Sequence, residues 1–157
     1  MKKIKLIIGL GNPDRQYEKT YHNAGHLMAD YLERQETRDK RQILKTDVFM
    51  NKSGQFVKES LKKGKVKPEQ LLVIHDDADI ELGRFKLSFG RNSAGHKGAQ
   101  NIINQLKTKD FWRLRIGIRP PKSKEKADKL VLKNIPPAKL NVLKKVFKEA
   151  LIRLEQL

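Results

Sequence analysis

The sequence predicts an α/β fold in which a twisted mixed β-sheet is flanked by helices, within a single domain that spans residues 1–157. Short apolar runs rich in β-branched residues alternate along the chain with segments whose apolar residues recur at helical spacing. The apolar runs end in glycine, proline or polar residues, as strands do where they enter loops. A length of 157 residues leaves room for one core.

The first part of the chain predicts a strand, a loop and a helix. The run Ile4–Leu10 has the pattern of a buried strand, which Gly11-Asn12-Pro13 ends. From His22 to Arg34 apolar residues recur at helical spacing, and Asn23 or Thr20 is the expected N-cap. This part of the chain therefore forms a strand–loop–helix unit.

The next part predicts two strands with a helix between them. After a polar connection at residues 33–42, a short strand is expected within Ile43–Met50 and a helix over about Ser53–Lys62. The run Leu71–Ile74 is the second buried-strand signal. We expect that strand to end at His75-Asp76-Asp77.

The last part predicts two strands and two helices. Phe85–Phe89 alternates as a strand that pairs antiparallel with a neighbour, and Gly95–Leu106 has helical spacing. Trp112–Ile118 alternates again before Pro120-Pro121. The final helix is expected over about Pro137–Leu157, with lysines on its outer face. Whether this helix covers a cleft stays open at this point.

The charge balance indicates a polyanionic partner. The chain has 35 Lys plus Arg against 18 Asp plus Glu, a formal net charge of +17. Such a field attracts nucleic acid first and an anionic membrane surface second. The alternative is that the charge serves solubility alone.

The absence of cysteine excludes several chemistries. Without cysteine there is no disulfide, no thiolate zinc site and no cysteine nucleophile. The apolar run near the N-terminus is too short for a membrane span and lacks the pattern of a signal peptide. We therefore expect a cytoplasmic protein that does not enter a membrane.

Polar clusters follow the predicted strands, where open α/β sheets usually bind ligands. The imidazole of His22 can accept a proton at cellular pH as a general base, and a carboxylate such as Asp76 can hold its other ring nitrogen. Asn12 and Asn51 each stand at a turn and can orient a carbonyl or a water molecule. Taken singly, His22 is as well explained by capping or packing, and His75 by burial in the core.

Several familiar site types are not indicated. Gly9-x-Gly11 lacks the third glycine of a dinucleotide fingerprint, and Pro13 stands where the helix should begin. The sequence contains no Walker loop and no Gly-x-Ser-x-Gly elbow. The Asp76–Asp79 segment lacks the spacing of a calcium loop, so no metal site is expected.

Blocks of sequence that occur together in a fixed order between residue 4 and about residue 120 carry a family resemblance. They are Gly9–Pro13; Tyr17, Thr20 and His22–Gly25; Phe49–Gly54; His75–Asp79; Gly83 with Phe85–Leu87; Gly95–Gly98; and Phe111–Ile118. In this order they resemble the signature blocks of bacterial-type peptidyl-tRNA hydrolases. The resemblance implies a three-layer α/β sandwich and hydrolysis of the ester that joins a peptide to the 3′ end of tRNA, with no metal or organic cofactor.

The resemblance also assigns roles to individual residues. His22 matches the catalytic base, and Asp76 matches the carboxylate that orients it. Asn12 and Asn51 match the asparagines that bind the peptide and position the water. Further matches to substrate-contacting positions are Tyr17, Met50, His96 and Lys97, and Lys86 and Arg115 match positions that contact tRNA phosphate.

The chain departs from the family pattern in four places. Lys97 replaces an asparagine that normally holds substrate or water, and a lysine donates hydrogen bonds but cannot accept them. It therefore either grips the tRNA acceptor end or stabilises an oxyanion. Asp14 and Tyr21 replace a glycine and an arginine, which alters loop shape and local charge. The stretch between His22 and Asn51 is shorter than in the family, which predicts a lost or shortened hairpin.

The resemblance implies a monomer that acts on peptidyl-tRNA, and two rival functions stay open. One is a non-catalytic RNA-binding relative of the same fold, which the charge and Lys97 favour. The other is a peptidase or other small hydrolase of similar layout. The joint presence of His22, Asp76, Asn12 and Asn51 favours the peptidyl-tRNA hydrolase over the pure binder.

Overall fold

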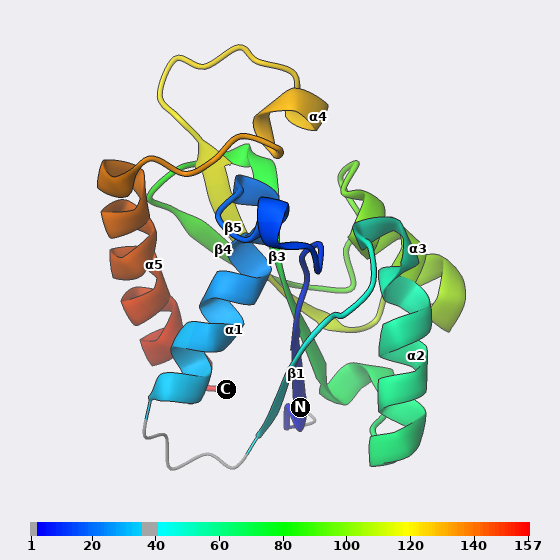
Figure 1. The fold of residues 1–157 in the computed structure, drawn as a ribbon. Coiled ribbons are helices and arrows are strands. Elements are labelled where there is room, and N and C mark those ends of the chain that lie inside the picture. Colours follow the sequence, from blue (N-terminus) through cyan, green and yellow to red (C-terminus); the bar gives the residue numbers. More distant parts are fainter. Residues whose placement is uncertain (1–2, 36–40) are drawn as a thin grey trace.

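Within the described residues, five strands form one sheet in the order β2–β1–β3–β5–β4 (Figure 1). The computed structural model describes residues 3–35 and 41–157. The strands are β1 (Leu6–Gly9), β2 (Gln42–Lys45), β3 (Leu71–Glu81), β4 (Phe85–Phe89) and β5 (Trp112–Arg119). Neighbours pair parallel except β4 with β5, whose antiparallel pairing confirms the mixed sheet.

Helices cover both faces of the sheet, which gives the expected three layers. The helices are α1 (Ala24–Arg34), α2 (Ser53–Gly64), α3 (Lys97–Leu106), α4 (Ala127–Leu130) and α5 (Pro137–Glu155). Figure 1 shows α1 and α5 on one side of the sheet and α2 and α3 on the other, with α4 near the upper edge. Parallel neighbours need such crossover connections, so helices on both faces follow from the strand order.

Strand β3 is buried on both faces because two separate apolar clusters pack against it. Leu72 and Ile74 belong to the cluster under α1 and α5. Leu71 and Val73 belong to the cluster under α2 and α3. Alternate side chains of a strand point to opposite faces, so the central strand is apolar at every position in this run.

The expectation that the central strand ends at His75-Asp76-Asp77 is wrong. β3 continues to Glu81, pairing with β5 as far as Asp77↔Gly117 and again at Glu81↔Arg119 after a register shift. Because β5 supplies a hydrogen-bonding partner over this stretch, the polar residues stay within the strand. Asp76 therefore stands on a paired, rigid backbone rather than in a loop.

Two further parts of the chain were considered from the sequence, the polar connection before β2 and the last helix. Helix α1 ends at Arg34, and residues 36–40 of the expected polar connection lie outside the described residues. Helix α5 packs beside α1 on the face of the sheet, so it does not cover a cleft as a lid (Figure 1). No helix within residues 3–35 and 41–157 is both long and apolar enough to cross a membrane.

Candidate active site

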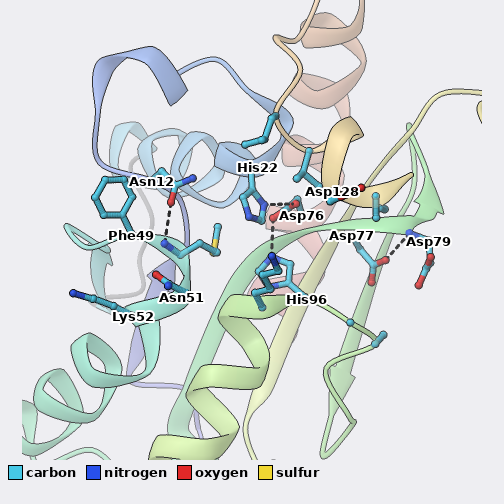
Figure 2. A pocket seen from close by; sticks show the side chains of 18 residues that line it. Asn12, His22, Phe49, Asn51, Lys52, Asp76, Asp77, Asp79, His96 and Asp128 are labelled. Atoms are coloured by element: carbon cyan, nitrogen blue, oxygen red, sulfur yellow. Dashed lines mark hydrogen bonds and ion pairs between the residues drawn. The ribbon is translucent and has the colours of Figure 1, made fainter. Parts of the chain in front are cut away.

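A cavity of about 720 Å³ opens at the carboxyl ends of β1 and β3 (Figure 2). Its wall combines the loop after β1, the turns before α1 and α2, the middle of β3 and the start of α3. The predicted site residues that line it are Asn12, His22, Met50, Asn51, Asp76, His96 and Lys97. These seven residues come from five separate parts of the chain and meet at one place.

The buried carboxylate of Asp76 joins two imidazole rings. Nδ1 of His22 lies 2.8 Å from Oδ2 of Asp76, and Nε2 of His96 lies 2.8 Å from Oδ1 (Figure 2). The Asp76 side chain is 1% exposed, whereas that of His22 is 13% exposed. His22 is therefore the ring that reaches the cavity while its carboxylate partner stays away from water.

The hydrogen bonds fix which nitrogen carries the proton in each ring. An ionised carboxylate only accepts, so Nδ1–H of His22 and Nε2–H of His96 both donate to Asp76. Nδ1 of His96 accepts from the backbone N–H of Ala99, which leaves neither nitrogen of that ring for other chemistry. Nε2 of His22 makes no hydrogen bond within the described residues, so it is the lone pair that can take a proton.

Burial and nearby charge have opposite effects on the pKa of Asp76. Burial raises the pKa of its carboxyl group, and the two facing imidazoles with their hydrogen bonds lower it. The imidazoles prevail, because the pKa of Asp76 lies below the ordinary value for aspartate. The carboxylate is thus ionised at neutral pH and can stabilise an imidazolium.

Close glycine packing brings His22 to Asp76. A Cβ on Gly25 would lie 2.4 Å from the carbonyl oxygen of Ile74 and 2.5 Å from that of Leu10. A Cβ on Gly9 would lie 2.3 Å from the carbonyl oxygen of Gly25. The start of α1 therefore contacts β1 and β3 directly, and His22 sits in the turn just before it.

Asn12 is held by hydrogen bonds on three sides. Asn23 accepts from the Asn12 N–H at 2.8 Å and donates its amide to the Asn12 carbonyl at 2.9 Å. Oδ1 of Asn12 accepts from the Met50 N–H at 2.9 Å, which turns Nδ2 of Asn12 toward the cavity (Figure 2). Asn23 stands at the expected N-cap position of α1, but its side chain makes no cap hydrogen bond, and the Thr20 hydroxyl donates to the Tyr17 carbonyl instead.

Thr46 and His26 support the loop that carries Gly11 and Asn12, and neither residue was predicted from the sequence. The Thr46 hydroxyl lies 3.3 Å from the Gly11 N–H and 3.0 Å from Nε2 of His26. Burial, with the charge of Lys45, lowers the pKa of His26 to about 4, so this ring is neutral at physiological pH. No sequence pattern marks His26 as a supporting residue, because Thr46 comes close to it only through the pairing of β2 with β1.

Two predicted substrate positions lie away from the cavity. Tyr17 is half-buried in the turn Arg15–Tyr17 and is not among the residues that line the cavity. Lys86 is exposed on β4, opposite Arg115 in the antiparallel ladder. Neither contacts the His22–Asp76 pair in the described hydrogen bonds.

Arg115 differs most from its expected place. Its side chain is 9% exposed, and its Nε donates to Oδ2 of Asp77 at 2.9 Å. Nη1 also donates to the Ser88 hydroxyl at 3.2 Å. Because β3 continues past His75, Asp77 lies beside β5 on the same face of the sheet as Arg115. It binds the guanidinium of Arg115, which we expected at the surface in contact with tRNA phosphate.

Segment 127–132, which contains α4, forms the remaining wall of the cavity and had no sequence signal. The N–H groups of His22 and Tyr21 donate to the carbonyls of Val131 and Lys133, at 2.8 and 3.1 Å. Leu132 is 53% exposed there, and Phe49 is 47% exposed on the cavity wall before α2. The cavity therefore has apolar surface beside its polar centre.

Within the described residues, one group could offer three ligands to a metal ion. The ligand atoms of His22, Asp76 and His96 lie within 4.8 Å of one another. The same atoms make the two 2.8 Å hydrogen bonds, so the donor set is already paired internally. This arrangement can supply an oriented base, and the Nδ2 of Asn12 can supply a donor for a carbonyl oxygen.

Comparison with known proteins gives one consistent result. The family model described as peptidyl-tRNA hydrolase matches residues 6–157. The chain is 38% identical to the peptidyl-tRNA hydrolase of Aquifex aeolicus, over 94% of the chain and 86% of that protein. It is 39% identical to that of Mycoplasma capricolum, over 92% and 87%. The crystal structure of the Acinetobacter baumannii peptidyl-tRNA hydrolase matches with a TM-score of 0.85 at 31% identity, covering 99% of the chain and 88% of that structure.

Proposed function

Because the chain belongs to the peptidyl-tRNA hydrolase family, we propose that it cleaves the ester between peptide and tRNA, with His22 as the general base. One observation carries the assignment of the base. Nδ1 of His22 is hydrogen-bonded to the ionised Asp76 at 2.8 Å, while Nε2, beside the cavity, has no hydrogen-bond partner among the residues that the structure describes. An imidazole held in this way can accept a proton from water.

The proposed reaction begins when Nε2 of His22 takes a proton from a water molecule in the cavity. The water oxygen attacks the ester carbonyl carbon, and Asp76 stabilises the imidazolium that forms. The tetrahedral intermediate then breaks its bond to the 3′ oxygen of the tRNA. His22 returns the proton to that oxygen, which releases free tRNA and a peptide carboxylate.

Neighbouring residues would hold the substrate and its developing charge. Nδ2 of Asn12 is turned into the cavity and can donate to the carbonyl oxygen, where negative charge develops. Asn51 lines the same wall and supplies a further donor, and Lys97 beside it offers a positive charge to the acceptor end of the tRNA. Met50 with the exposed Phe49 offers apolar surface to the peptide.

We assign the tRNA phosphate contact to Lys86. It is exposed, and the net charge of +17 supports attraction of a polyanion. Arg115 supports the site indirectly, because its guanidinium is committed to Asp77 on the strand that carries Asp76. Tyr17 would contact a part of the substrate outside the cavity.

We also propose that the protein acts in the cytoplasm as a monomer. The lack of cysteine suits a reducing compartment, and a net charge of +17 opposes self-association. Light scattering on the eluted protein at physiological salt measures the mass directly. A dimer at micromolar concentration would contradict this proposal.

The decisive experiment for the proposed function is hydrolysis of an N-acyl-aminoacyl-tRNA by the pure protein. Turnover supports the enzyme, whereas tight binding without turnover at enzyme excess would support the non-catalytic RNA-binding relative. A small-substrate hydrolase would cleave an N-acyl-aminoacyl ester equally well after the tRNA body is removed. We expect the rate at low substrate to fall when the tRNA body is removed or the salt is raised.

A further inference from the structure

His75 is a fully buried histidine that the proposed reaction does not use. Its Nδ1 lies 2.7 Å from the carbonyl oxygen of Asp76, and its Nε2 lies 3.2 Å from Nη1 of Arg113. Its ring packs on that of His96 with 4.3 Å between the ring centroids. Neither His75 nor Arg113 lines the cavity. His75 thus contacts Asp76, the partner of the catalytic base, and His96, the second imidazole on that carboxylate, without lining the cavity.

Arg113 connects this histidine to the loop that delivers His96. Its side chain lies within the core, as the residue is 1% exposed. Nη2 donates to the backbone carbonyls of Asn92 and, at 3.4 Å, of Arg91. These two residues lie early in the connection from β4 to α3, four and five positions before His96. One buried guanidinium therefore binds both the ring under His96 and the backbone that leads to it.

The connection between β4 and α3 needs such an anchor because part of its backbone has an unfavourable conformation. Ala94 and Gly95 have φ angles of 53° and 85°, and a left-handed conformation is unfavourable for alanine. His96 follows directly and caps α3 through Ala99. Movement of the Arg91–Asn92 backbone would therefore be passed on to the His96 ring and its bond to Asp76.

We propose that His75 and Arg113 are positioning residues that hold His96 against Asp76 and so fix the carboxylate that orients His22. The inference rests on the proposed function. The contacts form one continuous line from Arg113 through His75 and His96 to Asp76 and His22, and each link is a hydrogen bond or a ring contact. Arg113 acts at a distance from the reacting atoms.

The hydrogen bonds define the protonation state that this role requires. Arginine only donates, so Nε2 of His75 accepts and the ring proton sits on Nδ1, where it donates to the Asp76 carbonyl. Burial, together with the charges of His96 and Arg113, lowers the pKa of His75 well below its usual value. A proton on Nε2 would face the guanidinium and push the loop away from His96.

The kinetic test compares His75→Phe in two backgrounds. Phenylalanine keeps a ring under His96 but loses both hydrogen bonds. In the wild-type background we expect kcat to fall about 10-fold with KM within about 2-fold, because orientation and not substrate contact is lost. In a His96→Ala background the same substitution should change kcat by less than about 2-fold, since the residue through which His75 acts is gone.

Two matched variants separate positioning from general destabilisation. Val146→Ala, on the buried face of α5, removes core volume and should lower stability without changing kcat. Arg113→Lys keeps a cationic donor and should retain more activity than Arg113→Met. If His75→Phe does not fold, Arg113→Met replaces it in the kinetic test. Equal kcat losses in His75→Phe and Val146→Ala, or additive losses with His96→Ala, would overturn the proposal.

A spectroscopic test needs no turnover and so stands apart from the proposed function. In long-range ¹H–¹⁵N spectra of the imidazoles, His75 should remain neutral with its proton on Nδ1 from about pH 5 to about pH 8. Arg113→Met should broaden or shift the His96 signals while the protein stays folded. Unchanged His96 signals in that variant, or a proton on Nε2 of His75, would overturn the positioning role. Lack of hydrolysis by the wild type would instead count against the proposed function.

Discussion

Nδ1 of His22 lies 2.8 Å from Oδ2 of Asp76, although the two residues stand 54 positions apart in the chain. One sits in a turn before α1 and the other in the middle of β3. The close contact of Gly25 with the backbone of β1 and β3 makes this distance possible. The fold thus orients a base with a carboxylate that is buried, ionised and held by a second imidazole.

Asp76→Asn should lower kcat by about 10³-fold with little change in tRNA affinity. The asparagine amide can donate to Nδ1 of His22, which would move the ring proton to Nε2 and remove the base. The stabilising charge for the imidazolium is lost as well. Steady-state kinetics and circular dichroism check the result, with the exposed Asp110→Asn as a control that removes the same charge. A loss of less than about 10-fold would contradict the role of Asp76.

The sequence predicted the layers, and seven of the residues that it proposed for the site line one cavity. Apolar periodicity indicated the strands and helices, and the resemblance grouped His22, Asp76, Asn12 and Asn51. The expected end of β3 at His75-Asp76-Asp77 was wrong, since continuation of a strand depends on whether β5 supplies a partner there. No local pattern contains that information.

The supporting residues could not be predicted for the same reason. Asn23 has the sequence of a helix cap, yet its side chain binds the Asn12 backbone. Arg115 has the sequence of a surface cation, yet Asp77 on the neighbouring strand binds it. His26 meets Thr46 only because β2 pairs with β1. In each case the partner is chosen by tertiary packing between distant segments.

Lys97 is expected to bind tRNA rather than to replace the missing amide. It is exposed at the first position of α3, on the cavity wall. Both Lys97→Asn and Lys97→Ala should raise KM about 3- to 10-fold and reduce the salt dependence of binding by about one phosphate contact. The value of kcat should not change. Faster turnover in Lys97→Asn, but not in Lys97→Ala, would show instead that the lysine is a deficit in the water network.

Lys86→Ala should weaken tRNA binding by about 1 kcal/mol, because an exposed phosphate contact is lost. The slope of log affinity against log salt should fall by about 0.7 to 0.9. Lys148→Ala on the outer face of α5 removes the same charge at a distance from the cavity and should leave affinity and slope unchanged. Binding measured by filter retention at several salt concentrations checks both variants. Equal effects of the two substitutions would indicate a general charge effect.

Stability should fall as the pH drops from about 6.5 to about 4. In the unfolded chain a histidine takes up a proton near pH 6.5, whereas folded His26 does so only at about 4. Its stabilising contribution is thus complete above about pH 6.5 and is lost as the pH falls toward the folded pKa. Asp76 has a depressed pKa, so its contribution is lost only below about pH 4.

Urea unfolding at pH 7 and pH 5 measures this dependence. His26→Phe keeps a ring against Gly11 and should reduce the proton uptake on unfolding by about one. The remaining dependence in that variant includes His75, whose pKa is also lowered by burial. An unchanged pH dependence in His26→Phe would contradict the neutral state of this ring.

The most direct test of the central claim is single-turnover hydrolysis of an N-acyl-aminoacyl-tRNA by wild-type protein and His22→Ala at enzyme excess. With all substrate bound, the rate reports the chemical step and not affinity. If His22 is the general base, the variant should bind tRNA as tightly as wild type and cleave it about 10²- to 10⁴-fold more slowly. A His22→Ala protein that cleaves bound substrate within a few-fold of the wild-type rate would contradict the account.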